Sequence, residues 1–179
     1  MDLADGAGGR EREIVDLFAT TFTASEGAEE GALIGRLVRD LLDRTPPDEL
    51  RVFTASDEGA LAGAVIFTRL RYAGDARRVV LLSPMAVGPG WQGRGTGQAL
   101  IRHALDTLRA EGADVALTYG DPAFYGKVGF GPVTEATAPP PQPLSQPEGW
   151  MGQALDGGDI APLTGPATCA AALDDAAYW

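Results

Sequence analysis

Residues 85–97 read MAVGPGWQGRGTG, and this stretch decides the fold because it joins a strand to a helix. Before it, residues 77–87 contain the run Val-Val-Leu-Leu, whose apolarity on both faces indicates a central, doubly covered strand. After it, residues 97–111 place their apolar side chains on one side, which predicts a helix. Residues 115–119 are again strand-like. Strand, glycine loop, helix and strand predict a right-handed βαβ unit with a parallel pair.

The glycines of this loop have a chemical consequence. Gly93, Gly95 and Gly97 let successive N–H groups converge, and a helix N-terminus adds unpaired amides and a positive dipole end that favour phosphate oxygens. Arg94 contributes a positive charge. The alternative is a tight turn whose glycines only allow the helix to pack on the sheet. Three alternating glycines at this boundary favour the phosphate interpretation.

Spacing narrows the class of phosphate compound. A Walker loop needs Lys followed by Ser or Thr after its last glycine, and no such pair is present. A dinucleotide-binding fold would use G-x-G-x-x-G, whereas here the third glycine, Gly97, comes one place early. Mononucleotide and dinucleotide sites are therefore weak competitors.

The segment before the glycine loop predicts two helices and a hairpin. Residues 10–22 and 33–42 carry apolar side chains three and four places apart, a spacing that puts one apolar stripe on each of two helices. We expect residues 25–30, with Gly27, to form a loop between them. Residues 51–55 and 61–72 read as strands joined by a turn at Asp57-Glu58-Gly59. On this interpretation two helices precede any strand.

The charge balance limits the partners. With 14 Lys and Arg against 25 Asp and Glu, the formal net charge is −11. Nucleic acid and an anionic membrane surface both attract basic proteins, so neither is expected as a partner. With 45% hydrophobic and 22% charged residues, the 179-residue chain is typical of one globular domain with a substantial core.

Cysteine and histidine are each present once. Cys169 has no partner for an intramolecular disulfide, and with His103 it falls short of a zinc ligand set, so we expect no metal. Residues 79–87, the longest uncharged apolar run in the middle of the chain, are about half as long as a bilayer span requires. We expect a cytoplasmic protein without a transmembrane helix.

The C-terminal third is less regular. Five prolines lie within residues 138–147, which favours an extended surface connection over a PxxP interaction motif. We expect one strand at 150–155 in a C-terminal strand region that spans 150–179. Trp150, Tyr178 and Trp179 there are candidates either to close a substrate pocket or to cover a homodimer contact.

Two motifs resemble those of the Gcn5-related N-acetyltransferases. That family's acyl-coenzyme A loop reads Q/R-x-x-G-x-G/A, which residues 92–97 match fully, and residues 85–87 fall at its strand-end L-x-V. Residues 124–130, FYGKVGF, are similar to the family's Y-x-K/R-x-G-F. Residues 120–125 look like the YhbS-like subgroup of bacterial N-acetyltransferases. The resemblance covers residues 10–130 well, and the order of elements agrees.

The resemblance implies a fold and a reaction. The fold would be α/β, a single domain over residues 1–179 with a mixed, V-shaped central sheet flanked by helices. The activity would be direct transfer of acetyl from acetyl-coenzyme A to a primary amine, with no metal and no covalent enzyme intermediate. The residues that would contact the coenzyme are Met85, Ala86, Val87, Gln92, Gly93, Arg94, Gly95, Thr96, Gly97, Asp121 and Tyr125.

The resemblance also implies catalytic roles. Tyr125 matches the family's tyrosine that protonates the leaving thiolate, although it could instead be a core aromatic beside Phe124 and Phe130. A backbone N–H near Val87 would stabilise the developing oxyanion. Candidates for the base are Glu26, Glu29, Glu30 and Asp121, and for each of the three glutamates a solvated surface charge is the alternative. Asp121 could also act as a turn-former that positions Tyr125.

Two other functions remain open from the sequence. A coenzyme A or acyl-coenzyme A sensor would keep the loop and lack an acceptor site. An interaction protein would work through the proline-rich segment and the aromatic C-terminal end, and would not bind coenzyme. For an enzyme, the acceptor would be a small-molecule or peptide amine, and the acidic exterior favours cationic acceptors.

Overall fold

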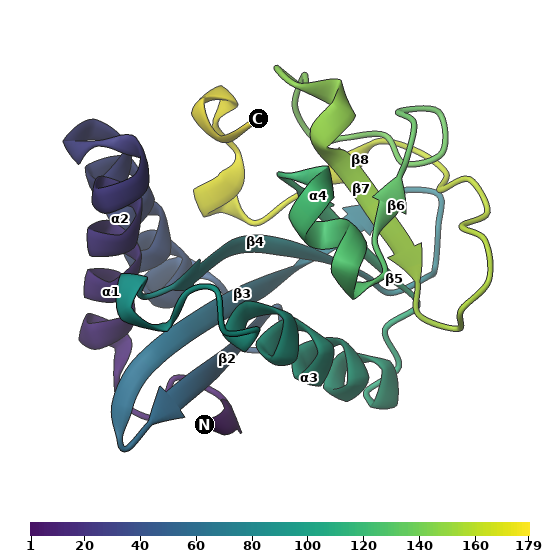
Figure 1. The fold of residues 1–179 in the computed structure, drawn as a ribbon. Helices are drawn as coiled ribbons and strands as arrows, with labels where there is room; N and C mark the ends of the chain where they lie inside the picture. Colours follow the sequence, from purple (N-terminus) through teal and green to yellow (C-terminus); the bar gives the residue numbers. More distant parts are fainter. The chain divides into compact units, whose positions relative to one another are not determined.

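The computed structural model describes residues 1–179, which form four α-helices and eight strands in a mixed sheet. The helices are α1 (Glu11–Glu26), α2 (Ala28–Arg44), α3 (Thr96–Ala110) and α4 (Pro122–Tyr125). The strands are β1 (Asp2–Asp5), β2 (Leu50–Asp57), β3 (Ala60–Tyr72), β4 (Val79–Val87), β5 (Val115–Tyr119), β6 (Gly131–Pro132), β7 (Trp150–Ala154) and β8 (Ala167–Thr168). The strand order is β1-β2-β3-β4-β5-β7-β6, and β8 pairs with β3. The predicted α/β class with a mixed sheet is confirmed (Figure 1).

The chain packs as two compact units. The boundaries between the units fall within β3, β4 and α3, so each of these elements contributes residues to both. One unit comprises Met1–Phe67 and Pro84–Ala104, and the other comprises Thr68–Ser83 and Leu105–Trp179. Each unit has its own buried apolar interior.

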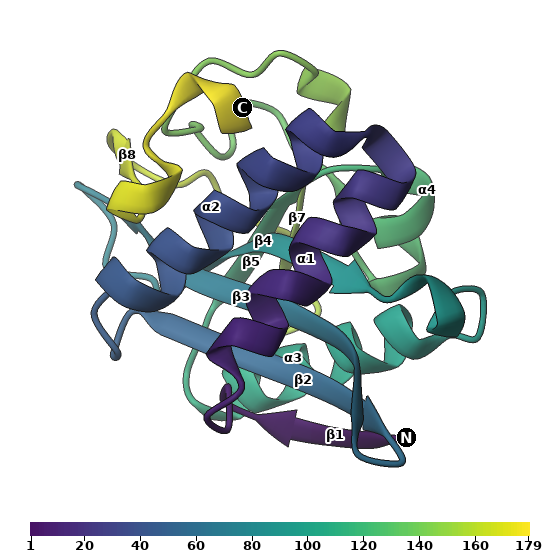
Figure 2. The same ribbon diagram turned by 90° about the vertical axis from the view of Figure 1, so that its left-hand side faces the viewer.

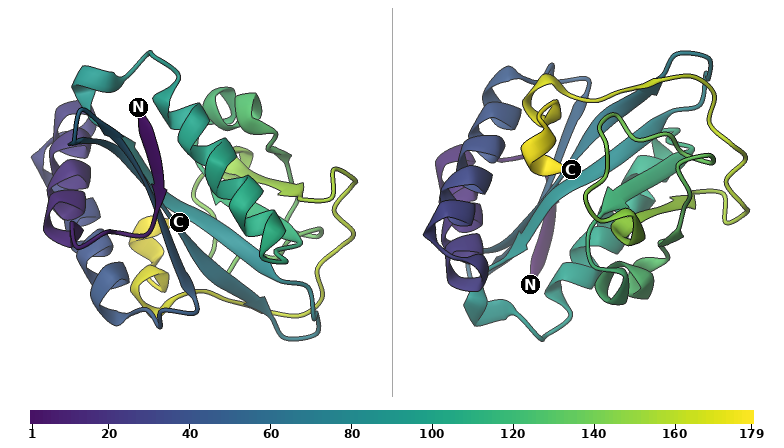
Figure 3. Two further views of the ribbon diagram at one scale, coloured as in Figure 1. Left: turned by 90° about the horizontal axis from the view of Figure 1, so that it is seen from below. Right: turned by 90° about the horizontal axis from the view of Figure 1, so that it is seen from above.

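In the first unit, α1 and α2 lie side by side over the β2–β3 hairpin (Figure 2). The apolar stripe predicted from the sequence is the buried face of α1, where Ile14 and Phe18 are fully buried. The first part of α3 covers the opposite face of the same strands (Figure 3), and the ring of its His103 meets Phe53 of β2 edge-on at 5.9 Å. Helices on both faces explain why β3 is buried along most of its length.

Two expectations about this unit are wrong. Strand β1 precedes both helices and pairs antiparallel with β2. Its sequence, Asp-Leu-Ala-Asp, carries no strand signal, and pairing with the exposed edge of β2 makes it a strand. The loop expected at residues 25–30 is also absent, because Gly27 alone separates α1 from α2, with φ of 102°. Only glycine adopts this conformation readily, so one residue reverses the chain.

In the second unit, β4 and β5 form the predicted parallel pair, in register from Val79 with Val115 to Leu82 with Thr118. Strand β7 pairs antiparallel with β5, and the short β6 pairs with β7. The proline-rich residues 138–147 form no strand and reach a single 3-10 turn only at Pro147, as expected. The carbonyl of Ala138, at the start of this proline-rich segment, accepts a hydrogen bond from the indole N–H of Trp150 at 2.8 Å.

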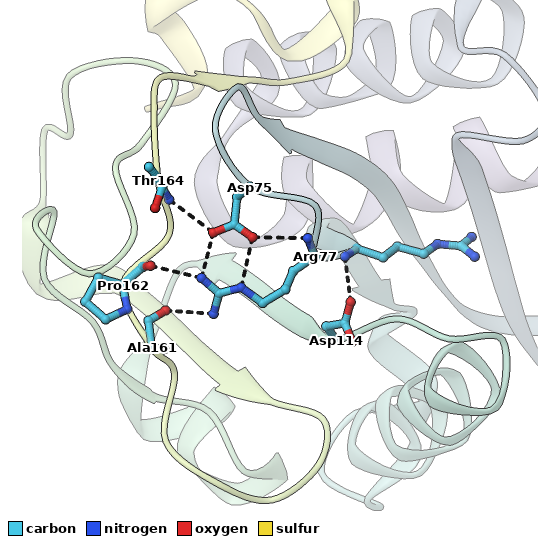
Figure 4. Close-up of polar contacts among 7 residues, drawn as sticks. Asp75, Arg77, Asp114, Ala161, Pro162 and Thr164 are labelled. Carbon is cyan, nitrogen blue, oxygen red and sulfur yellow. Dashed lines mark hydrogen bonds and ion pairs between the residues drawn. The ribbon is translucent and has the colours of Figure 1, made fainter.

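A charged cluster and an aromatic cluster fix the C-terminal segment of this unit. Arg77 donates two hydrogen bonds to the carboxylate of Asp75 and two more to the carbonyls of Ala161 and Pro162 (Figure 4). Asp75 also accepts the N–H of Thr164 at 3.2 Å. The chain then ends at Trp179, whose ring stacks on Tyr119 and meets Trp150 edge-on.

Trp150 and Trp179 are therefore covered within the chain. Trp150 is fully buried and Trp179 is 6% exposed, so neither presents an apolar face to a partner. Of the two alternatives for these tryptophans, a dimer contact made through their rings does not fit this packing. No helix of the protein combines the length and the apolarity that a membrane span requires.

Candidate functional site

The glycine loop connects the end of β4 to the start of α3 through one turn of 3-10 helix, Pro89–Trp91. Gly93 and Gly95 have φ of 73° and 79°, in the left-handed region that strains any other residue. Two such residues separated by one other turn the backbone sharply just before Thr96 begins the helix. The sequence therefore needs glycine at 93 and 95 for the path of the chain itself.

Hydrogen bonds hold the loop to the strand from which it departs. The side-chain amide of Gln92 donates to the carbonyl of Val87 at 2.8 Å, which closes the loop back onto the end of β4. Gly88 N–H donates to Ala62 O of β3 at 2.9 Å. A Cβ on Gly63 would lie 3.1 Å from Ala86 O, so β3 approaches this strand end closely. The end of β4 at Val87 is therefore held both by the loop and by β3.

The donors of the loop fit a phosphate group. The first N–H groups of α3 have no partner within the helix, and they carry the positive end of its dipole. The side chain of Arg94 is exposed, and Gln92, Gly93 and Gly95 are exposed with it. Thr96 and Gly97 are buried at the start of the helix, and Met85 is half-buried on β4. No group of His, Cys, Asp and Glu side chains is arranged to hold a metal ion.

Tyr125 lies in the second unit, at the end of the short helix α4. Asp121 caps this helix, because its carboxylate accepts the N–H of Ala123 at 2.8 Å. The carbonyl of Asp121 accepts the N–H of Tyr125 at 3.0 Å, and Pro122 occupies the first turn, where its missing N–H costs nothing. Asp121 thus acts as the turn-former that sets the position of Tyr125.

The ring of Tyr125 is enclosed. It meets Phe124 and Phe130 edge-on, with centroids 5.1 and 5.8 Å away. A Cβ on Gly120 would lie 2.7 Å from the ring, so only glycine leaves room for it. The side chain of Thr118 acts in the opposite direction to burial and lowers the pKa of this phenol. Burial, with a smaller effect from the charge of Asp121, raises the pKa of Tyr125 to about 12, so the phenol is neutral at physiological pH.

The loop and the tyrosine motif both lie within the part of the chain that a family model recognises. The model described as the acetyltransferase (GNAT) family matches residues 12–130. The chain belongs to the GNAT acetyltransferase family.

Relatives agree with this membership. The GNAT chain is 33% identical over 139 residues to YjhQ of Escherichia coli, an uncharacterised N-acetyltransferase, covering 75% of this chain and 76% of YjhQ. The crystal structure of E. coli YhbS in complex with CoA has a TM-score of 0.81 at 22% identity, over 98% of this chain and 92% of YhbS. A GNAT acetyltransferase from Brucella melitensis in complex with acetyl-CoA has a TM-score of 0.70 at 23% identity, over 97% of both chains. At these identities the two solved structures show a shared fold.

The glutamates considered as the base of this GNAT protein lie on helices. Glu26 is the last residue of α1, while Glu29 and Glu30 occupy the first turn of α2. Glu26 and Glu29 are exposed and Glu30 is half-buried. Carboxylates in a first helical turn are stabilised by the helix dipole, which gives Glu29 and Glu30 a structural reason to be there.

The structure brings the candidate residues together in two groups. Met85 to Gly97 form one continuous loop site in the first unit, and Asp121 and Tyr125 form a local cluster in the second. Two contacting residues were not singled out from the sequence. Thr118 could have been found from the sequence, because apart from the terminal tyrosine it carries the one hydroxyl group in the apolar strand Val-Ala-Leu-Thr-Tyr. Asp57 accepts a hydrogen bond from Trp91, which lies 34 positions away, and no local sequence pattern predicts such a pair.

Proposed function

We propose that this protein transfers an acetyl group from acetyl-coenzyme A directly to a primary amine. The observation that carries the proposal is the loop between β4 and α3, where left-handed Gly93 and Gly95 lead into an open helix N-terminus. Such a terminus favours a pyrophosphate, which coenzyme A contains. Membership of the GNAT family supplies the reaction class. We further propose that residues 1–179 act as a single domain.

Different residues of the chain would bind different parts of acetyl-coenzyme A. The amides from Gln92 to Gly97 would hold the pyrophosphate, with Arg94 adding charge. The edge of β4 at Met85, Ala86 and Val87 would hydrogen-bond the pantetheine arm as an added strand does. Acetyl-coenzyme A supplies the activated thioester as substrate. A backbone N–H near Val87 would then stabilise negative charge that develops on the carbonyl oxygen.

Tyr125 is the proposed general acid. Attack by the amine ends with a thiolate as leaving group, which needs a proton. A buried phenol whose pKa is raised to about 12 keeps its proton at neutral pH, so it is in the donating form. For the base, which removes a proton from the amine, Glu26 and Glu30 remain the proposed candidates, with Glu29 beside them. In the family this step commonly runs through water.

Coenzyme binding and acceptor turnover test the proposal separately. Isothermal titration with coenzyme A should give a micromolar or tighter dissociation constant, and the absence of any heat would overturn the proposal. A panel of primary amines with acetyl-coenzyme A should then release free thiol, detected by a chromogenic disulfide. Binding without thiol release for any amine would indicate the sensor instead.

Tyr125→Phe tests the assignment of the acid. General acid catalysis contributes about 100-fold or more, so kcat should fall by about that factor while the dissociation constant of coenzyme A stays within about two-fold. The conservative loss of one hydroxyl keeps the ring between Phe124 and Phe130. A variant that turns over at the wild-type rate would show that Tyr125 is only a core aromatic.

A further inference from the structure

Trp91 makes a hydrogen bond that connects the glycine loop to a distant hairpin. Its indole N–H donates to Oδ2 of Asp57 at 3.1 Å. Trp91 ends the 3-10 turn that precedes the loop, and Asp57 ends strand β2. Both side chains are half-buried, and both belong to the first unit. A carboxylate that accepts from an N–H group forms a stronger bond than a neutral acceptor.

Asp57 has a rigid support. The two residues after it, Glu58 and Gly59, have φ of 49° and 84°, which makes a two-residue turn whose twist matches the strands. The guanidinium of Arg10, at the start of α1, donates to Ser56 Oγ at 3.0 Å and to Gly59 O at 3.3 Å. The hairpin tip is therefore fixed on both sides of Asp57.

Trp91 passes this support to both ends of the loop. The backbone N–H of Trp91 donates to Gly88 O at 2.8 Å, beside the end of β4. Its backbone carbonyl accepts from Thr96 Oγ1 at 3.4 Å, where α3 begins. Its ring lies against Gly88, where a Cβ would come within 3.0 Å of it. Between these points, Gly93 and Gly95 add backbone freedom, so the loop needs an external anchor.

We propose that Asp57 is a positioning residue for the coenzyme-binding loop, acting through Trp91; this inference rests on the proposed function. A loop whose amides already converge loses less conformational entropy on binding than a mobile one. The contact from Asp57 to Trp91 supplies that order before the ligand arrives. Asp57 bears a negative charge that a polyphosphate disfavours, so it contributes through its hydrogen bond to Trp91 and not through contact with the ligand.

Four variants test the role, with coenzyme A as the probe in isothermal titration. Asp57→Ala should raise the dissociation constant about five-fold, which corresponds to the net worth of one typical hydrogen bond. Trp91→Phe, which keeps a ring and removes the N–H, should give a similar rise. Because the two side chains act through one bond, the double variant should be no weaker than either single one. Asp57→Asn keeps an acceptor oxygen and should restore affinity to within about two-fold of wild type.

A matched control removes an exposed carboxylate elsewhere in the same unit. Asp48→Ala makes the same change in net charge and should leave the dissociation constant unchanged. Wild-type protein that does not bind coenzyme A overturns the proposed function and this inference with it. Wild-type protein that binds, while Asp57→Ala binds equally well or the two single effects add, overturns this inference alone. If Asp57→Ala fails to fold, Trp91→Phe decides the question in its place, and wild-type affinity in that variant overturns the inference.

Discussion

Thr118 joins two parts of the second unit through one hydroxyl group. It is fully buried at the last registered pair of the parallel β4–β5 ladder, and Oγ1 donates to Leu82 O at 3.1 Å. Its single hydrogen is thereby used within the β4–β5 ladder. Thr118 also acts on the phenol of Tyr125, whose pKa it lowers against the larger effect of burial.

Thr118→Val should therefore destabilise the protein although the two side chains have the same shape. The change removes the donor to Leu82 O, and a buried polar group left unpaired costs about 1–3 kcal/mol. Urea denaturation at neutral pH measures the loss in the free energy of unfolding. Thr118→Ser keeps the hydroxyl and should lose less. Equal stability of the valine variant and the wild type would show that the hydroxyl contributes nothing.

Tyr125 also predicts how stability depends on alkaline pH. Its folded pKa of about 12 is raised above the value of about 10 expected for the unfolded chain, so its contribution is complete below pH 10 and is lost as pH rises towards 12. Burial raises the pKa of Cys169 to about 11, which acts in the same direction. In Tyr125→Phe the fall in the free energy of unfolding between about pH 9 and 11 should be shallower than in the wild type. Urea denaturation at each pH measures the free energy of unfolding. If this free energy falls equally steeply with pH in the two proteins, the prediction is contradicted.

At the scale of elements, the α1–α2 hairpin depends on small residues where its helices cross. Gly35 of α2 faces Ala19 of α1, and a Cβ placed on Gly31 would overlap Thr23 Oγ1 and lie 2.6 Å from Ala19 O. The helices approach until backbone meets backbone, which the single-residue connection at Gly27 enforces. Larger side chains at this seam would push α2 away from α1.

Gly31→Ala should consequently destabilise the fold, although alanine favours helix by about 1 kcal/mol over glycine. Overpacking of a close contact costs about 1–3 kcal/mol, and we expect a net loss of stability in thermal or urea unfolding. Gly35→Ala is the graded comparison, because its Cβ would lie 3.1 Å from the methyl group of Ala19 and should cost less. Gly31→Ala as stable as the wild type would mean that the helices can separate freely.

The elements also show what a sequence can and cannot predict here. The stripe with Ile14 and Phe18, the doubly buried β4 and the turn at Glu58-Gly59 are local patterns, and each was predicted. Strand β1 was missed because pairing with β2, and not its own side chains, makes it extended. In the site, the glycine loop follows from spacing alone. The partners Asp57 and Thr118 follow from tertiary contacts, which periodicity does not encode.

At the scale of the whole chain, the cluster of Asp75 and Arg77 joins segments about 85 positions apart. The guanidinium of Arg77 bonds to the carbonyls of Ala161 and Pro162 while Asp75 holds it in place (Figure 4). The segment so fixed leads to β8, where Thr168 pairs with Arg71 of β3, and then to the C-terminal tryptophan. This half-buried ion pair is thus one of the contacts that set the path of the C-terminal segment, together with the aromatic cluster at Trp179.

Asp75→Asn should loosen this path and lower stability by about 2 kcal/mol at neutral pH, since Arg77 would lose a charged, two-point partner. The hydrogen bonds from Arg77 hold the pKa of Asp75 well below its usual range, so its contribution is complete above about pH 4 and is lost as pH falls further. The difference between variant and wild type in urea denaturation should shrink below that pH, and amide exchange at 159–168 should quicken in the variant. Asp106→Asn breaks an ion pair to Arg109 whose side chains are 73% and 49% exposed, and should cost less than about 1 kcal/mol. Equal losses from the two variants would show that Asp75 acts as an ordinary surface charge.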